Sequence, residues 1–247
     1  MDRRSGGSGG GAGGCGDSGS GAAGVTGVME AAVVTAAERG SPRKRERITE
    51  RFGNNSPMAT HVALLRGINL GGKNKVAMAD LRALVGELGH TDVVTYIQSG
   101  NVLFTAPPDA DSAAVARAMT EAIASTLGVT SPVVVVTREE LAQIYAANPF
   151  TDEPDPKRVH AVVLSAPPGA ELTAKLDAAA AQAAAKGAKD EATTVGRTLY
   201  LHTPAGYGTS DLSAAVLRIV SSPKAGVTGT ARNWATMTKL LELCDAT

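Results

Sequence analysis

The chain has 247 residues, which suffices for one large domain or two small ones with a hydrophobic core. Its 24 basic and 24 acidic side chains cancel, so no overall field attracts nucleic acid or an anionic membrane, and recognition of a charged ligand has to be local. Cys15 and Cys244 suggest no disulfide framework, and His61, His90 and the two later histidines show no metal-ligand spacing. We expect no metal, no cofactor and no membrane association, and we expect a cytoplasmic location.

Residues 1–57 differ in composition from the rest of the chain. A run rich in Gly and Ser is followed by the charged stretch SPRKRERITERF. Such sequence buries too little apolar surface to offset the entropy lost on ordering, so we predict a disordered tail. Its basic residues are also compatible with an arm for nucleic acid. Met58 stands directly before the first predicted strand, and translation from Met58 is expected to give a complete globular protein.

Residues 58–137 alternate clearly between strand and helix patterns. Helical spacing runs from Met78 to Leu88 and from Val115 to Ile123. A hairpin signal, Ser99-Gly100-Asn101, joins two β-rich runs. The predicted order is β-α-β-β-α-β, with strands at 60–68, 92–100, 101–106 and 131–137.

The same order recurs after a linker at 138–157. Thr137 and Glu140 predict a capping box that opens a linker helix, and a Pro-rich connector follows it. Residues 158–247 then repeat β-α-β-β-α-β and add a C-terminal helix. We therefore predict an α+β fold of two tandem ferredoxin-like (split-βαβ) domains with antiparallel sheets, preceded by the disordered tail.

This topology places candidate ligand residues at one edge of the first sheet. Strands one and two run parallel with strand three between them, so they end at the same edge. Glycines in the loops there allow backbone N–H groups to approach a ligand, and the polar side chains suit an anion or a polar small molecule. The predicted site comprises Arg66, Gly67, Asn69, Gly71, Gly72, Lys73, Lys75, Gln98, Ser99 and Asn101.

A second candidate edge lies in the predicted second domain, where its strands three and four end. Arginine offers a planar fork for a carboxylate or phosphate, and Tyr or Trp offers a stacking face. The residues expected to lie near one another there are Tyr207, Ser210, Arg232, Asn233 and Trp234.

Residues 67–73 spell GxxxxGK, the core of a phosphate-binding loop. A nucleotide-cleaving loop needs Ser or Thr after the lysine to hold magnesium, whereas this chain has Asn74. The helix pattern starts near Ala77 instead of at Lys73, and the predicted sheet is antiparallel, whereas the motif belongs to parallel α/β folds. We therefore predict that the chain does not cleave a nucleoside triphosphate.

The segments ALLRGINLGGKNKVAMADLRALVGELG, TYIQSGNVLF, NPF and ARNW resemble the bacterial domain-of-unknown-function family sixteen-ninety-seven. The resemblance runs from about Thr60 to the C-terminus and implies a duplicated ferredoxin-like fold, with no reaction, cofactor or substrate to transfer. The family tends towards basic residues where this chain has Thr209 and Asp211, and towards RNWNT where it has RNWAT. If relatives bind anions at that edge, binding here is expected to be weaker.

Each candidate residue also has a purely structural interpretation. The glycines of 67–72 are compatible with a tight turn, and Ser99-Gly100-Asn101 with hairpin chemistry. Trp234 begins an apolar stripe typical of a packing anchor. Arg66 is the hardest to explain structurally, although an ion pair with Asp80 or Glu87 is one account.

The sequence favours a protein that binds a phosphorylated or anionic small molecule, including a nucleotide, at the first edge or between the domains. A second hypothesis is an enzyme of unknown reaction in the inter-domain cleft, using Arg66, Arg232 and Tyr207. RNA binding and a protein-interaction role are the third and fourth. RNA binding on a sheet face requires aromatic residues, and the central strands offer only Phe104. The sequence indicates no oligomeric state.

Overall fold

The structure is a computed structural model that describes residues 59–246. The predicted tail at 1–57, which contains Cys15, lies outside the described residues, as do Met58 and Thr247. Within residues 59–246, no helix is both long enough and apolar enough to cross a membrane. Below, the first half means residues 59–137 and the second half means residues 158–246.

The first half forms a four-stranded antiparallel sheet with two helices, in the predicted order β-α-β-β-α-β. Along the sheet the strands are arranged β2-β3-β1-β4. Successive elements are β1 (His61–Leu65), α1 (Met78–Glu87), β2 (Thr91–Tyr96), β3 (Asn101–Thr105), α2 (Ser112–Leu127) and β4 (Val133–Thr137). Strand β2 is shorter than predicted, because the chain turns at Ile97.

Helix α3 (Arg138–Ala146) follows β4 and begins with the predicted capping box. Thr137 Oγ1 accepts from the Glu140 N–H at 3.1 Å, and Glu140 Oε2 accepts from the Thr137 N–H at 2.9 Å. Two N–H groups that the first helical turn leaves without partners are thereby satisfied.

The second half repeats this order around a second antiparallel sheet, arranged β6-β7-β5-β8. Its elements are β5 (Val159–Leu164), α4 (Ala170–Ala185), β6 (Glu191–Val195), β7 (Thr198–His202), the short 3-10 helix η1 (Tyr207–Thr209), α5 (Asp211–Val220), the short 3-10 helix η2 (Pro223–Ala225) and β8 (Gly229–Asn233). Helix α6 (Trp234–Asp245) follows β8 directly.

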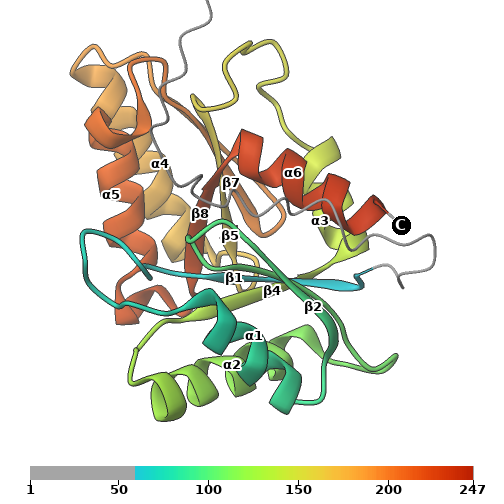
Figure 1. Cartoon of the computed structure of the whole chain (residues 1–247). Helices are drawn as coiled ribbons and strands as arrows, with labels where there is room; N and C mark the ends of the chain where they lie inside the picture. The colour runs from blue at the N-terminus through green and yellow to red at the C-terminus, as the bar shows by residue number, and fades with distance from the viewer. Residues whose placement is uncertain (1–58, 247) are drawn as a thin grey trace, which may run out of the picture. The chain divides into compact units, whose positions relative to one another are not determined.

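Side-chain alternation along the strands gives each sheet two buried faces. In β1, Ala63 and Leu65 pack with residues of α1 and α2, whereas Val62 and Leu64 pack with residues of the second sheet, α3 and α6. A third core lies between the second sheet and helices α4 and α5. Figure 1 shows α1 and α2 beside the first sheet and α4 and α5 beside the second. The central strands of the first sheet therefore present no open face to RNA.

The ends of β1 and β2 meet at the same edge of the first sheet, as the topology predicts. Leu64 and Tyr96 both pair with Asn101, and the Leu65 N–H donates to the Gly100 carbonyl at 2.8 Å. Gly100 has φ +77°, and a Cβ there would lie 2.7 Å from the Leu65 Cβ. Only glycine therefore fits where this turn crosses the end of β1.

Candidate functional site

Two asparagines fix the loop between β1 and α1. Asn69 Oδ1 accepts from the Val76 N–H at 2.9 Å, and its Nδ2 donates to the carbonyls of Val76 and Gln98, each at 3.0 Å. Asn74 Nδ2 donates to the Gly67 carbonyl at 2.9 Å. Both asparagines have positive φ, which this residue type tolerates. Asn69, a predicted ligand residue, thus uses its amide to hold the loop against the β2–β3 turn.

Asn101 and Ser99 also bond within the protein. Asn101 is fully buried, and its Nδ2 donates to the Tyr96 carbonyl at 3.1 Å and to Ser99 Oγ at 3.0 Å. Its Oδ1 accepts from Nε of Arg232 at 2.6 Å, across the two halves of the chain. The Asn101 side chain therefore joins the first sheet to the second half and is not directed to a ligand.

The Arg232 side chain extends from β8 to the end of the first sheet. One terminal nitrogen donates to the carbonyls of Leu65 at 2.7 Å, Ser99 at 3.1 Å and Gly100 at 3.2 Å. The other donates to Thr230 Oγ1, at 2.8 Å. Burial lowers the pKa of Arg232 to about 10, so the guanidinium stays charged at neutral pH. All of this bonding is internal, which leaves Arg232 with a structural role.

The other residues of the predicted second edge take up separate roles. Ser210 and Asn233 are N-caps of α5 and α6, accepting from the N–H groups of Ser213 at 2.9 Å and Thr236 at 2.8 Å. The Ser210 hydroxyl also donates to Asp190 Oδ2 at 2.6 Å.

The two aromatic residues of that edge are packed against other rings. Trp234 stacks on Tyr145 with ring centroids 5.2 Å apart, as expected of a packing anchor. Tyr207 stacks on His160 at 3.9 Å, and burial raises the pKa of Tyr207 to about 12. A phenol with so high a pKa is poorly matched to acid–base catalysis near neutral pH.

Arg66 differs from Arg232 in that its guanidinium has no hydrogen-bond acceptor within residues 59–246. Its backbone is fixed, since the N–H donates to the Pro132 carbonyl at 3.0 Å and the carbonyl accepts from Ser131 Oγ at 2.9 Å. Within residues 59–246 its side chain makes no hydrogen bond and no ion pair. The ion pair with Asp80 or Glu87 that the sequence offered as an explanation is therefore not formed. The side chain is partly buried, and this burial lowers the pKa of Arg66.

Arg66 lines an open hollow of about 490 Å³ whose other lining residues all belong to the second half. We call it the Arg66 hollow. It lies beside η2, the loop after β5 and the segment before β8, and none of its lining residues is acidic. The lining consists of Arg66, Ser165, Val220, Ser221, Ser222, Pro223, Gly226, Val227 and Thr228.

Two serines of the Arg66 hollow keep a hydroxyl hydrogen available. Ser165 Oγ accepts from the Thr228 N–H at 2.9 Å, and Ser222 Oγ accepts from the Lys224 N–H at 3.3 Å. Because a hydroxyl donates one bond as well as accepting, each remains able to donate to an anion. No motif in the sequence pointed to these residues, because they come from the other half and reach Arg66 only through packing.

The remaining predicted residues of the first edge lie in the exposed loops. Lys73, Lys75 and Gln98 are exposed, and none of them lines the Arg66 hollow. Gly67, Gly71 and Gly72 have φ of +70°, +56° and +79°, and a Cβ on any of them would meet nothing within 4 Å. They are therefore needed for the backbone shape of the turn and not for close contact inside the protein.

The GxxxxGK stretch does not form a phosphate-binding loop. Helix α1 begins at Met78 and not at Lys73, as it would in that motif, and the sheet is antiparallel. Two of the differences from the motif that the sequence predicted, the later helix start and the antiparallel sheet, are thus found in the structure.

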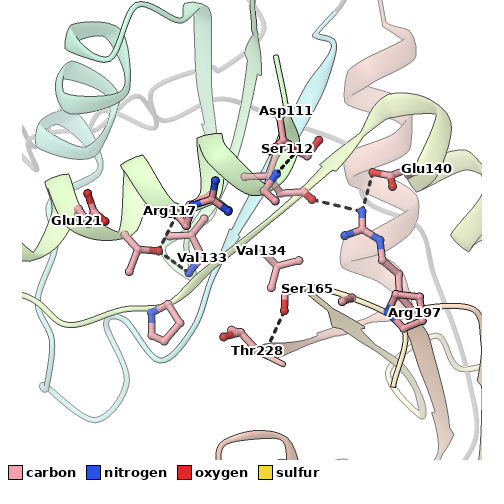
Figure 2. A pocket seen from close by; sticks show the side chains of 17 residues that line it. Asp111, Ser112, Arg117, Glu121, Val133, Val134, Glu140, Ser165, Arg197 and Thr228 are labelled. Carbon is pink, nitrogen blue, oxygen red and sulfur yellow. Dashed lines mark hydrogen bonds and ion pairs between the residues drawn. The ribbon is translucent and has the colours of Figure 1, made fainter. Parts of the chain in front are cut away.

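A larger hollow, of about 760 Å³, lies between the start of α2, the outer edge of β4 and the loop after β5 (Figure 2). Two of its charges form an ion pair: Arg197 donates to Glu140 Oε2 at 2.6 Å and also to the Val135 carbonyl at 3.3 Å. Thr120 Oγ1 accepts from the Val133 N–H at 3.2 Å. Side chains thus cover part of the exposed edge of β4, which limits its pairing with other strands.

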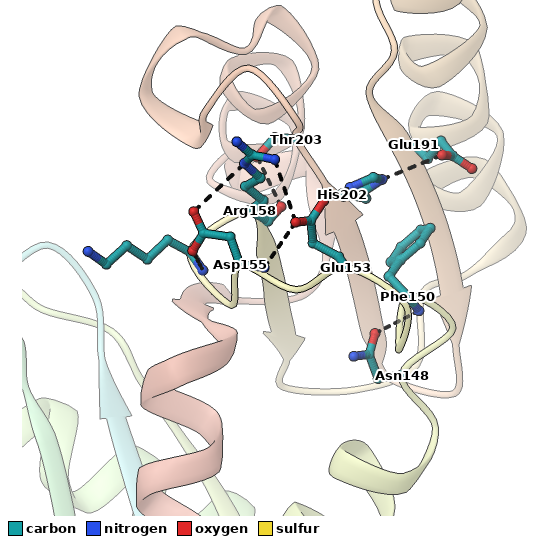
Figure 3. Close-up of polar contacts among 9 residues, drawn as sticks. Asn148, Phe150, Glu153, Asp155, Arg158, Glu191, His202 and Thr203 are labelled. Carbon is teal, nitrogen blue, oxygen red and sulfur yellow. Dashed lines mark hydrogen bonds and ion pairs between the residues drawn. The ribbon is translucent and has the colours of Figure 1, made fainter.

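A charged network fixes the connector between the halves (Figure 3). His202 Nε2 lies 2.7 Å from Glu153 Oε2, and Arg158 lies 3.6 Å from the other Glu153 oxygen. Two hydrogen bonds lower the pKa of Glu153: the one from the Asp155 N–H has the larger effect, and the one from His202 the smaller. Sequence spacing did not predict this network, since it marked His202 only as an ordinary histidine. Among residues 59–246, no group of three or more His, Cys, Asp or Glu side chains is arranged to hold a metal ion.

The chain is a mixed α/β protein with two four-stranded antiparallel sheets and, among the described residues, six α-helices. It is similar to the solved structure of the conserved bacterial protein SP0830 from Streptococcus pneumoniae. The TM-score is 0.53 and the identity 22%, over 76% of this chain and 99% of that one. A likeness at this identity supports the fold alone.

Residues 58–200, more than half of the chain, match the family described as protein of unknown function (DUF1697). The chain belongs to this family, and the resemblance inferred from its sequence segments is confirmed. No curated protein matches the chain at a significant level.

Proposed function

We propose that the protein binds a phosphorylated or otherwise anionic small molecule in the Arg66 hollow. The observation that carries this proposal is the charge of Arg66, which is partly buried and has no counter-charge within the described residues. Withdrawing a cation from water without a partner is unfavourable, and an anion would offset that penalty.

The surroundings of Arg66 support an oxyanion as the ligand. The planar guanidinium matches two oxygens of a phosphate or carboxylate at once, and the Ser165 and Ser222 hydroxyls add donors. A volume of about 490 Å³ lies within the range of small-molecule sites. The site takes one residue, Arg66, from the first edge that the sequence favoured, and its other lining residues come from the second half.

We also infer that each half is a ferredoxin-like unit, with boundaries at 58–137 and 158–247 around the linker at 138–157. The order β-α-β-β-α-β in each half and the sheet orders β2-β3-β1-β4 and β6-β7-β5-β8 support this inference. On this view, the Arg66 hollow is a site between duplicated units.

Titration calorimetry with inorganic phosphate, citrate and AMP tests the proposal. At about 0.15 M salt, where exposed charges are screened, at least one of these anions should bind the wild-type protein. Arg66→Ala should abolish that binding, and Arg66→Lys should retain part of it because the charge remains but the planar fork is lost.

Arg82→Ala is the matched control, since Arg82 is an exposed arginine of the same half whose side chain bonds only to Thr95 Oγ1 among the described residues. It should bind like the wild type. Equal binding by Arg66→Ala and Arg82→Ala, or no binding of any of the anions by the wild type, would refute the proposal. Thermal melts of each variant confirm that it is folded.

A further inference from the structure

A second basic hollow lies next to the Arg66 hollow, and residues of η2 line both. It has a volume of about 410 Å³ and lies between α4, the end of α5 and η2. Three cationic side chains line it, Lys175, Arg218 and Lys224, with a single acidic one, Glu171. We call it the Lys224 hollow.

Internal contacts account for only part of this positive charge. Lys175 Nζ bonds to Glu171 Oε1 at 2.6 Å, one turn apart on α4. Arg218 and Lys224 have no ion pair within residues 59–246. The position of Arg218 in the last turn of α5 is favourable for the helix dipole, but Lys224 belongs to η2 and has no such role.

Ser222 lines both hollows, so they share a wall. Cations without an ion pair among the described residues therefore line both hollows, Arg66 in one and Arg218 with Lys224 in the other. A ligand with a single phosphate would neutralise only one of these groups of cations.

We propose that the natural ligand carries two anionic groups on a short linker, as in an organic diphosphate or bisphosphate. Arg66 binds one group, and Arg218 with Lys224 binds the other. This inference rests on the proposed function, because it takes the Arg66 hollow as the first of the two subsites. Once the first group is bound, the second binds at a high effective concentration, so the two-group ligand should bind about ten- to a hundredfold more tightly than phosphate.

Calorimetry on the full chain at about 0.15 M salt tests this with three probes: inorganic phosphate, inorganic pyrophosphate and fructose 1,6-bisphosphate. The last two differ in the separation of their phosphoryl groups, so together they cover a short and a longer linker. The wild type should bind at least one of them about tenfold or more tightly than phosphate.

The double variant Arg218→Ala/Lys224→Ala should bind that probe no more tightly than phosphate, while its affinity for phosphate stays unchanged. The double variant Arg82→Ala/Lys189→Ala removes the same charge from exposed positions away from both hollows and should behave like the wild type. Arg66→Ala should weaken all three probes.

The outcomes separate the two proposals. If phosphate binds in an Arg66-dependent way but neither two-group probe binds more tightly, the two-subsite inference is overturned and the proposed function stands. The same holds if Arg218→Ala/Lys224→Ala leaves the advantage of the two-group probe intact. If binding of none of these probes depends on Arg66, the two-subsite inference fails, and the proposed function fails with it unless citrate or AMP binds in an Arg66-dependent way.

Discussion

Arg232 Nε donates to Asn101 Oδ1 at 2.6 Å, although the two residues are 131 positions apart in the chain. The same guanidinium donates to the carbonyls of Leu65, Ser99 and Gly100. Strand β8 of the second sheet thereby supplies hydrogen-bond donors to the carbonyl groups at the edge where β1 and the β2–β3 turn meet. That edge is also the one that positions the Arg66 backbone.

Arg232→Ala is expected to destabilise the protein by about 3 kcal/mol or more. The substitution leaves Asn101 Oδ1 and backbone carbonyls buried without donors, and each such group costs about 1–3 kcal/mol. Urea denaturation measures the change. Arg82→Ala, on the exposed face of α1, should stay within about 0.5 kcal/mol of the wild type. A loss below about 1 kcal/mol for Arg232→Ala would contradict the bonding described.

Gly100→Ala and Gly86→Ala should have opposite effects on stability. At Gly100 a Cβ would lie 2.7 Å from Leu65 Cβ with φ at +77°, so we expect a loss of about 2 kcal/mol or more. Gly86 lies within α1 with nothing within 4 Å of an added Cβ, and alanine there should stabilise by roughly 0.5–1 kcal/mol. Chemical denaturation of both variants provides the comparison. A Gly100→Ala protein as stable as the wild type would rule out the close approach of the turn to β1.

His160 should make stability fall as the pH drops from 6.5 to 4. Burial lowers the pKa of His160 from 6.5 to about 4, so in this range the unfolded chain binds a proton that the folded protein does not. Above pH 6.5 both states are neutral and nothing is lost. Below pH 4 the histidine is protonated in both states, and the free energy of unfolding is lower by the full amount of roughly 3 kcal/mol.

Comparison with His160→Gln isolates this contribution from those of other groups. Between pH 7 and pH 4.5, the free energy of unfolding should decrease by about 2–3 kcal/mol less in the variant than in the wild type. The measurement is urea denaturation at the two pH values. His61 and His90, whose pKa values burial also lowers, add a loss of the same sign in both proteins. Equal decreases would show that His160 is not buried as described.

His202→Ala should raise the pKa of Glu153 without restoring it fully. The hydrogen bond from the Asp155 N–H is the larger cause of the lowered pKa and survives the substitution, whereas the bond from His202 is lost. Carbon-13 NMR titration of the glutamate side chains measures the shift. His90→Ala, which leaves the Glu153 bonds untouched, is the control. A Glu153 pKa that does not change in His202→Ala would argue against the 2.7 Å contact.

The order of strands and helices could be predicted because apolar periodicity and turn residues fix each element locally. The meeting of the end of β1 with the β2–β3 turn could be predicted because topology alone brings the ends of like-directed strands together. The roles of Asn69 and Asn101 could not be predicted, because a side-chain amide that can hydrogen-bond a ligand can equally well hydrogen-bond backbone groups. The left-handed conformation of Ile97, at φ +48°, could not be predicted either, because β-branched residues rarely adopt positive φ.

The composition of the Arg66 hollow depends on how the two halves pack, which sequence patterns leave unspecified. Ser165, Ser222 and Thr228 lie in loops of the second half and carry no motif of their own. The direction of the Arg232 side chain also depends on how the two halves pack. The predicted topology grouped it with Tyr207 at the second edge, whereas its hydrogen bonds lie largely at the first.

The span between Asn101 and Arg232 also governs the order of events during synthesis. The ribosome synthesises β1 and β3 long before it adds Arg232, which donates hydrogen bonds to the carbonyls next to these strands. The carbonyls of Leu65, Ser99 and Gly100 therefore lack this donor until β8 has been synthesised and has packed against the first half. Although each half has its own sheet, the hydrogen bonds of Arg232 make the stability of the two halves interdependent.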